Sequence, residues 1–211
     1  MSVWMGDRNV EIIVLEETIK MPHQKQSGRM ILSQIEQRIE KTPYFISHLV
    51  VDGVVVYDEF ESYLDKHMDR IDQIIVETRD IGTFIEEILI SEMHYLEGAL
   101  PELRGLVAEL STSPDENTWM RLGDFFDALQ WMFESFEGID SQQNLSSTIR
   151  DYRVWNRYSK EIYIINSQVP ELEKAFRRQD FTGLARILDH EMIPALERLL
   201  SHILGLVDLE R

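Results

Sequence analysis

The chain has no cysteine and few basic residues for its length. Zero cysteines among 211 residues exclude disulfides, thiolate metal sites and cysteine nucleophiles. Lysine and arginine number 21 against 38 aspartate and glutamate residues, a net charge of −17. This charge repels phosphate backbones and anionic lipid surfaces. We therefore expect no nucleic-acid partner and no membrane surface as a partner.

Long uncharged apolar runs are also missing. No run of about 18 apolar residues occurs, so the sequence predicts no membrane-spanning helix. The N-terminal MSVWMGDRNVEIIV lacks the basic region and the apolar run of a secretory signal. The hydrophobic content of 44% is ample for a buried core. These features predict a soluble, cytoplasmic protein.

Residues 1–79 show mixed α and β patterns. The β-branched stretch Val10–Lys20 predicts a strand, and the preceding Gly6–Asn9 can turn the chain back on a short strand at Ser2–Met5. After a polar break, Ser27 can cap a helix that runs from about Gly28 to Lys41. The first part of the chain therefore predicts a strand pair followed by a helix.

A second hairpin follows this helix. Asp52-Gly53 tolerates the positive φ angles of a type I′ turn and separates two strands, Phe45–Val51 and Val54–Tyr57. A short helix through Phe60 to Met68 and a last strand at Gln73–Thr78 complete the region. The order strand, strand, helix, strand, strand, short helix, strand resembles the ubiquitin-like β-grasp arrangement by analogy of element order.

From Asp80 onward the apolar residues recur with the period of helices. The first helix should run from Asp80 to about Ser111, with a kink or short break at Gly98 and Pro101. The second is Ser113–Gly138, which is the most apolar amphipathic stretch of the chain.

The second helix has a predicted capping box, in which Ser113 is the N-cap and Glu116 follows three residues later. A third helix should start near Asn144 and break at Pro170, and a fourth should run from Asp180 almost to Arg211. Its predicted bend lies at Pro194.

Short connections of roughly five or six residues favour antiparallel neighbours among these helices. The sequence therefore predicts an α+β protein. A small β-grasp-like N-terminal domain, residues 1–79, should pack on a C-terminal antiparallel four-helix bundle, residues 80–211.

The helical half also carries a family resemblance. The pattern Trp119, Leu122, Phe126 and ALQWM, together with DFTGLARILDHEMIPAL, resembles uncharacterised bacterial helical proteins known only as a domain of unknown function. The resemblance covers residues 80–205. It implies a helical bundle and a bacterial cytosolic origin, and it implies no activity, cofactor or functional residue.

Three aromatic or sulfur-containing residues are interface candidates. Trp131 falls outside the apolar stripe of its helix, on the face of Met120 and near the acids Asp124 and Asp127, and Trp119 lies close by in sequence. Aromatic and Met residues are enriched at interface cores. The alternative is that these side chains pack against another part of the same chain.

Two further groups have weaker patterns. The first is a basic stripe, Arg150, Arg153 and Arg157, which could bind an anion or pair with the chain's own acids. The second would use carboxylates and imidazoles from two antiparallel helices to hold a metal. Its members are Glu87 and His94 on the first helix, and His190 and Glu197 on the fourth.

The sequence contains no catalytic or nucleotide-binding motif. We therefore expect a non-enzymatic protein-binding module, such as an adaptor, a chaperone-like protein or an assembly factor, that binds another protein or itself as a homodimer. We expect no cofactor. The alternative is an enzyme or sensor that holds a metal or small ligand in the helical bundle.

Overall fold

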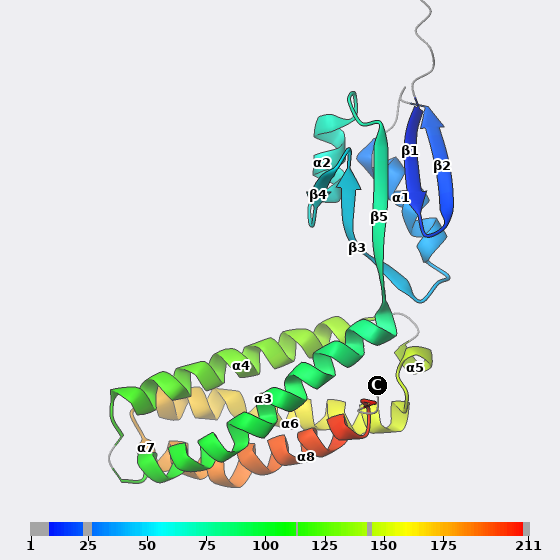
Figure 1. Cartoon of the computed structure of the whole chain (residues 1–211). Helices are drawn as coiled ribbons and strands as arrows, with labels where there is room; N and C mark the ends of the chain where they lie inside the picture. The colour runs from blue at the N-terminus through cyan, green and yellow to red at the C-terminus, as the bar shows by residue number, and fades with distance from the viewer. Residues whose placement is uncertain (1–8, 23–26, 113, 143–144, 209–211) are drawn as a thin grey trace, which may run out of the picture. The chain divides into compact units, whose positions relative to one another are not determined.

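The computed structural model describes residues 9–22, 27–112, 114–142 and 145–208. The chain divides into two compact units, residues 1–84 and 85–211. The first contains a five-stranded sheet and two helices, and the second is helical (Figure 1). The α+β class predicted from the sequence is confirmed.

The sheet of the first unit has the order β2-β1-β5-β3-β4. β1 runs parallel to β5, and the other neighbouring pairs are antiparallel. The sequence of strands and helices is the predicted one. The strands are β1 Asn9–Val14, β2 Glu17–Pro22, β3 Tyr44–Val51, β4 Val54–Val56 and β5 Gln73–Asp80.

The first hairpin lies further along the chain than predicted. The stretch Val10–Lys20, predicted as one strand, contains most of both β1 and β2, and the turn between them is Leu15-Glu16. Leu15 has a φ of 54°, a conformation that leucine rarely adopts. The turn has no Gly, Asn or Pro, which is why the sequence did not reveal it. The predicted strand Ser2–Met5 lies outside the described residues.

Two helices, α1 Gly28–Ile39 and α2 Phe60–His67, lie on one side of the sheet (Figure 1). As predicted, Ser27 caps α1 by accepting a hydrogen bond from the backbone N–H of Met30. The core lies between the helices and one face of the sheet. Its fully buried members are Val10, Ile12, Val14, Ile31, Ile35, Leu49, Leu64 and Ile74.

The second unit is built from long helices, with α6 packed along α7 and α8. An antiparallel packing of four helices stays a prediction. No helix among the described residues is both long and apolar enough to cross a membrane. The helices are α3 Ile81–Leu110, α4 Glu116–Asp140, α5 Leu145–Thr148, α6 Tyr152–Arg177, α7 Phe181–Ile187, the π-helical turn η1 Leu188–Met192, and α8 Ile193–Leu204.

The break predicted at Pro170 is absent, and so is a break at Pro101, where a kink stays a prediction. Pro101 lies inside α3 and Pro170 inside α6, and both helices continue past them. Each proline removes one backbone hydrogen bond, but the apolar stripe around it is packed: Leu103 is 4% exposed and Leu172 is fully buried. Tertiary packing therefore outweighs the local cost of the proline.

The N-terminus of α4 also differs from the prediction. The N-cap is Asp115, whose side chain accepts from the backbone N–H of Thr118 while the Thr118 hydroxyl binds the backbone N–H of Asp115. This is a capping box shifted two residues from the predicted one. The predicted cap Ser113 lies outside the described residues. The bend predicted at Pro194 is preceded by η1, an irregularity that periodicity alone does not reveal.

Gly28 marks the closest approach of α1 to α2. A Cβ built at this residue would lie 2.6 Å from the backbone oxygen of Glu61 and 3.1 Å from the Cβ of Leu64. We expect Gly28→Ala to lower the free energy of unfolding by about 1–3 kcal/mol, because rigid atoms must move apart. Urea denaturation measures this change. The control Ser33→Ala, exposed on the same helix, should change stability by less than about 0.5 kcal/mol, and equal effects of the two variants would contradict the argument.

A candidate protein-binding groove

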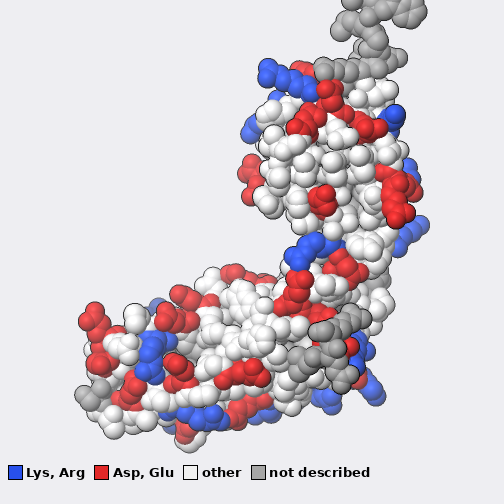
Figure 2. Space-filling view, in the orientation of Figure 1, with Lys and Arg blue, Asp and Glu red and all other residues white. Residues whose placement is uncertain are grey.

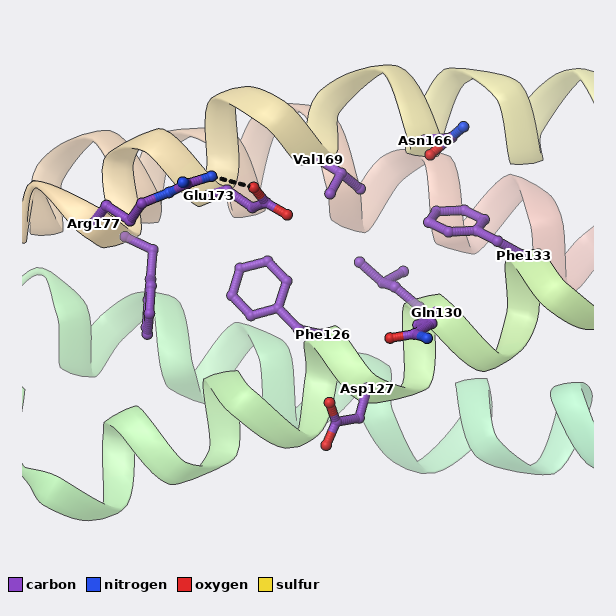
Figure 3. Close-up of a pocket in the computed structure, with 10 residues that line it drawn as sticks. Phe126, Asp127, Gln130, Phe133, Asn166, Val169, Glu173 and Arg177 are labelled. Carbon is purple, nitrogen blue, oxygen red and sulfur yellow. Dashed lines mark hydrogen bonds and ion pairs between the residues drawn. The ribbon is translucent and has the colours of Figure 1, made fainter.

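A groove of about 560 Å³ runs between α4 and α6. Phe126 and Phe133 from α4 point toward Val169 of α6 across the gap (Figure 3). These three side chains are partly exposed, so the floor of the groove is apolar and reaches solvent. The lining residues are Phe126, Asp127, Leu129, Gln130, Phe133, Asn166, Val169, Glu173, Phe176 and Arg177.

The apolar floor of the groove comes from residues of α4 that lie beside its core-facing stripe. Residues at spacings of three and four, including Leu122, Phe125 and Leu129, are at most 3% exposed and form the core-facing stripe. Phe126 and Phe133 are each offset by one position from that stripe, so they lie at its side, toward α6. The two rings therefore line the groove between α4 and α6.

Aromatic rings continue beside the groove. The ring of Trp119 lies 5.2 Å from that of Phe176 and 5.4 Å from that of Phe181, and Phe126 lies 5.7 Å from Phe176. Edge-to-face contacts of this kind stabilise the arrangement. Trp119, one of the predicted interface residues, therefore packs within its own chain, beside the groove.

The rim of the groove is more acidic than basic. Glu173 forms an ion pair with Arg177 at 2.5 Å (Figure 3). Gln130 donates to Glu134 at 2.8 Å. Asp127 is exposed and forms no hydrogen bond or ion pair within the described part of the chain. Figure 2 shows acidic side chains spread widely over the visible face of the helical unit. An occupant with basic side chains would find complementary charge here.

The other two predicted interface residues lie on the outer face of α4. Met120 is 60% exposed and Trp131 is 38% exposed. Asp127 precedes Trp131 by four residues, so the two side chains are neighbours on the helix surface. Because Asp127 also lines the groove, the outer face that carries Trp131 adjoins the groove directly.

The three arginines do not form one stripe. Asp151 caps α6 and the helix begins at Tyr152, so Arg150 lies outside it and donates to the backbone oxygen of Val207 at 3.4 Å. Arg153 is bound to the cap residue Asp151. The pKa of His202 is lowered mainly by burial, and the positive charge of Arg157 lowers it further. Of the three, only Arg150 therefore differs from its predicted place on the helix, and the binding of an anion by these arginines stays a prediction.

The candidate metal ligands lie beside different groups and do not form one cluster. Glu197 forms an ion pair with Arg104, and His190 lies 3.5 Å from Asp189. His94 lines a second pocket, between α3 and α4. Among the described residues, no group of three or more His, Cys, Asp or Glu could hold a metal ion. Glu87 therefore joins no such group either.

One buried acid, Glu92 on α3, was not predicted from the sequence. Its side chain is fully buried, and its Oε2 accepts a hydrogen bond of 2.8 Å from the hydroxyl of Tyr158 on α6. The Oε1 atom has no hydrogen-bond partner among the described residues. The spacing of Ile85, Leu89, Glu92 and Leu96 could have revealed it, because the acid occupies a place on the apolar stripe.

Burial raises the pKa of Glu92 to about 8, although the Tyr158 hydroxyl opposes this by stabilising the carboxylate. A second buried acid behaves differently. Glu161 accepts from Arg198 at 2.9 and 3.0 Å, so its charge is paired between α6 and α8. No cation from the described part of the chain pairs with Glu92, and its raised pKa means that the folded protein holds it mainly in the protonated form at neutral pH.

Two family models match the chain. One, described as a domain of unknown function (DUF8042), matches residues 87–202 in the helical unit. The other, described as the TP0873 N-terminal domain, matches residues 10–80. No curated protein and no solved structure matches the sequence. The two matches fall on either side of the boundary between the two units.

The buried acid should make stability depend on pH. An unfolded chain releases the proton of Glu92 near the ordinary pKa of 4.5, whereas the folded chain keeps it up to about 8. The free energy of unfolding should therefore decrease as the pH rises from about 4.5 to 8, and it should stay constant above pH 8. At about 1.4 kcal/mol per pKa unit, the total decrease is at most roughly 5 kcal/mol.

Glu92→Gln should flatten this pH dependence and make the protein more stable than wild type at pH 9. Urea denaturation between pH 5 and pH 9 measures both effects. Tyr158→Phe is the control, because it removes the hydrogen bond and keeps the acid, so its stability should still fall across this range. An unchanged slope in Glu92→Gln would contradict the assignment.

Proposed function

The chain belongs to the family defined by the domain of unknown function DUF8042, and we propose that its helical unit is a non-enzymatic protein-binding module. The observation that carries this proposal is the groove between α4 and α6, with an apolar floor open to solvent. Such a groove accepts the apolar face of an amphipathic helix. An adaptor, a chaperone-like protein or an assembly factor would use such a site.

The chemistry of the groove indicates what the partner carries. Phe126, Phe133 and Val169 form an apolar surface in the groove. A partner helix could place on it apolar side chains that are three or four residues apart in its own sequence. Asp127 and Glu134 stand beside this floor, and Glu173 is already paired with Arg177. We therefore propose an amphipathic helix with lysine or arginine beside its apolar stripe.

The outer face of α4 extends this surface. Trp131 and Met120 remain exposed although apolar residues of this size are usually covered. Tryptophan is enriched among the residues that dominate binding energy. We propose that Trp131 contacts the same partner from the side of Asp127. The proposed setting is the bacterial cytoplasm.

A second copy of the chain is a weaker candidate for the partner. Its net charge of −17 means that two copies repel one another, and the groove rim is itself acidic. A separate basic partner gives attraction where a homodimer gives repulsion. Sedimentation of the purified chain distinguishes the two, since a dimer dissociated by substitution at Val169 would favour the second copy.

The proposal predicts binding of a basic amphipathic model peptide. We expect a fluorescent helical peptide of about 18 residues, with a leucine stripe flanked by lysine, to bind the full chain with micromolar affinity. Val169→Lys should weaken binding by at least about tenfold, because it places a cation on the apolar floor. Trp131→Ala should weaken it by a smaller factor. Fluorescence anisotropy measures all three.

The matched control is Ser167→Lys, which adds the same charge at an exposed position of α6 outside the groove. Its affinity should equal that of the wild type. A peptide flanked by glutamate should bind more weakly than the lysine version. If neither peptide binds, or if both lysine variants weaken binding equally, the groove is not the binding site.

A further inference from the structure

The two outer strands of the sheet are protected differently. β2 forms one edge and β4 the other. β2 contains Glu17 and Lys20 and ends at Pro22, which are residues that discourage further strand pairing. β4 consists of three valines and has no charged residue or proline. An edge of this kind is available to another strand.

The backbone of β4 has hydrogen-bonding groups directed outward. Asp52 and Gly53 have φ angles of 48° and 85°, so they form a two-residue turn between Val51 and Val54, which pair directly. In such a hairpin the pair next to the turn is hydrogen-bonded and the following pair, Val50 and Val55, is not. The N–H and C=O of Val55 therefore point away from β3. No strand among the described residues pairs with that side of β4.

The side chains along this edge are apolar and exposed. Val54 is 52% exposed, Val55 46% and Tyr57 72%. Val55 also ends a row of directly paired residues on the sheet face opposite the helices. The row crosses all five strands and consists of Thr18, Ile13, Ile75, Val50 and Val55. An added strand would extend this row by one apolar residue.

Charge decides between a second copy of the chain and a different protein. Exposed acids flank the edge, with Asp58 and Glu59 after it and Asp52 before it, although the Asp52 carboxylate also accepts from the backbone N–H groups of Asp72 and Gln73. If two copies paired antiparallel about Val55, Asp52 of each would lie opposite Asp58 of the other. Like charges directly opposite are unfavourable. A strand with lysine or arginine at its ends meets the same acids with attraction.

We propose that β4 accepts an extended segment of a partner protein as a sixth strand, with a β-branched residue opposite Val55 and basic residues at its ends. Main-chain hydrogen bonds to Val55 supply affinity, and the flanking acids select the charge of the segment. This surface belongs to the N-terminal unit and uses no residue of the α4–α6 groove. Its test is therefore independent of the function proposed above.

The test uses the full chain and three fluorescent peptides, KTVTVTK, ETVTVTE and KTVPVTK. We expect the first to bind and the other two to bind at least about tenfold more weakly, because one reverses the end charges and the other removes a backbone donor. Val55→Lys should weaken binding of KTVTVTK by a similar factor. Thr18→Lys lies on the other edge strand, β2, and in the same row of the sheet, and it should leave the affinity for KTVTVTK unchanged.

Amide hydrogen exchange provides a readout that needs no variant. Bound KTVTVTK should slow exchange of the Val55 amide in the wild-type chain by at least about tenfold, while amides of β2 keep their rates. The proposal is overturned if KTVTVTK does not bind, if ETVTVTE binds as tightly, or if the protection lies away from β4. It is also overturned if the chain forms a dimer that Val55→Lys dissociates, since the occupant would then be a second copy.

Discussion

The burial of a single stripe of α4 determines the character of the helical unit. An amphipathic helix buries one face, which is about a third of its surface. In α4 that face consists of Leu122, Phe125, Leu129, Met132 and Phe136. Once these side chains are inside, the direction of every other side chain on the helix follows from the helical period. The remaining aromatic residues must then lie beside the core or outside it, which creates both the groove and the exposed outer face.

Buried charge imposes a second constraint on the same helices. Two acids, Glu92 and Glu161, lie inside a core that is otherwise almost entirely apolar. Glu161 is paired with Arg198, which joins α6 to α8, whereas Glu92 accepts a hydrogen bond from the hydroxyl of Tyr158 and has no cation beside it among the described residues. A charge without a counterion is unfavourable at low dielectric, so Glu92 takes up a proton instead. The α3–α6 contact therefore depends on a protonation state as well as on shape.

The constraint on the N-terminal unit is different, because every open sheet has two edge strands with unpaired backbone groups. One edge, β2, carries charges and a proline, and the other, β4, carries only valine. The helices cover one face of the sheet, and the opposite face keeps a half-exposed apolar row that ends at Val55. Both units thus present apolar surface bordered by acids, and the two binding proposals use this shared charge.

Local chemistry determined most of the element order from the sequence. Asp52-Gly53, Ser27 and the change of period at Asp80 act over a few residues, so the second hairpin, the cap of α1 and the start of the helical half could be predicted. The turn at Leu15 could not, since its residue types give no turn signal. Tertiary packing decided the rest. It carried α3 through Pro101 and buried Glu92 against Tyr158, because these outcomes depend on contacts between residues far apart in the chain.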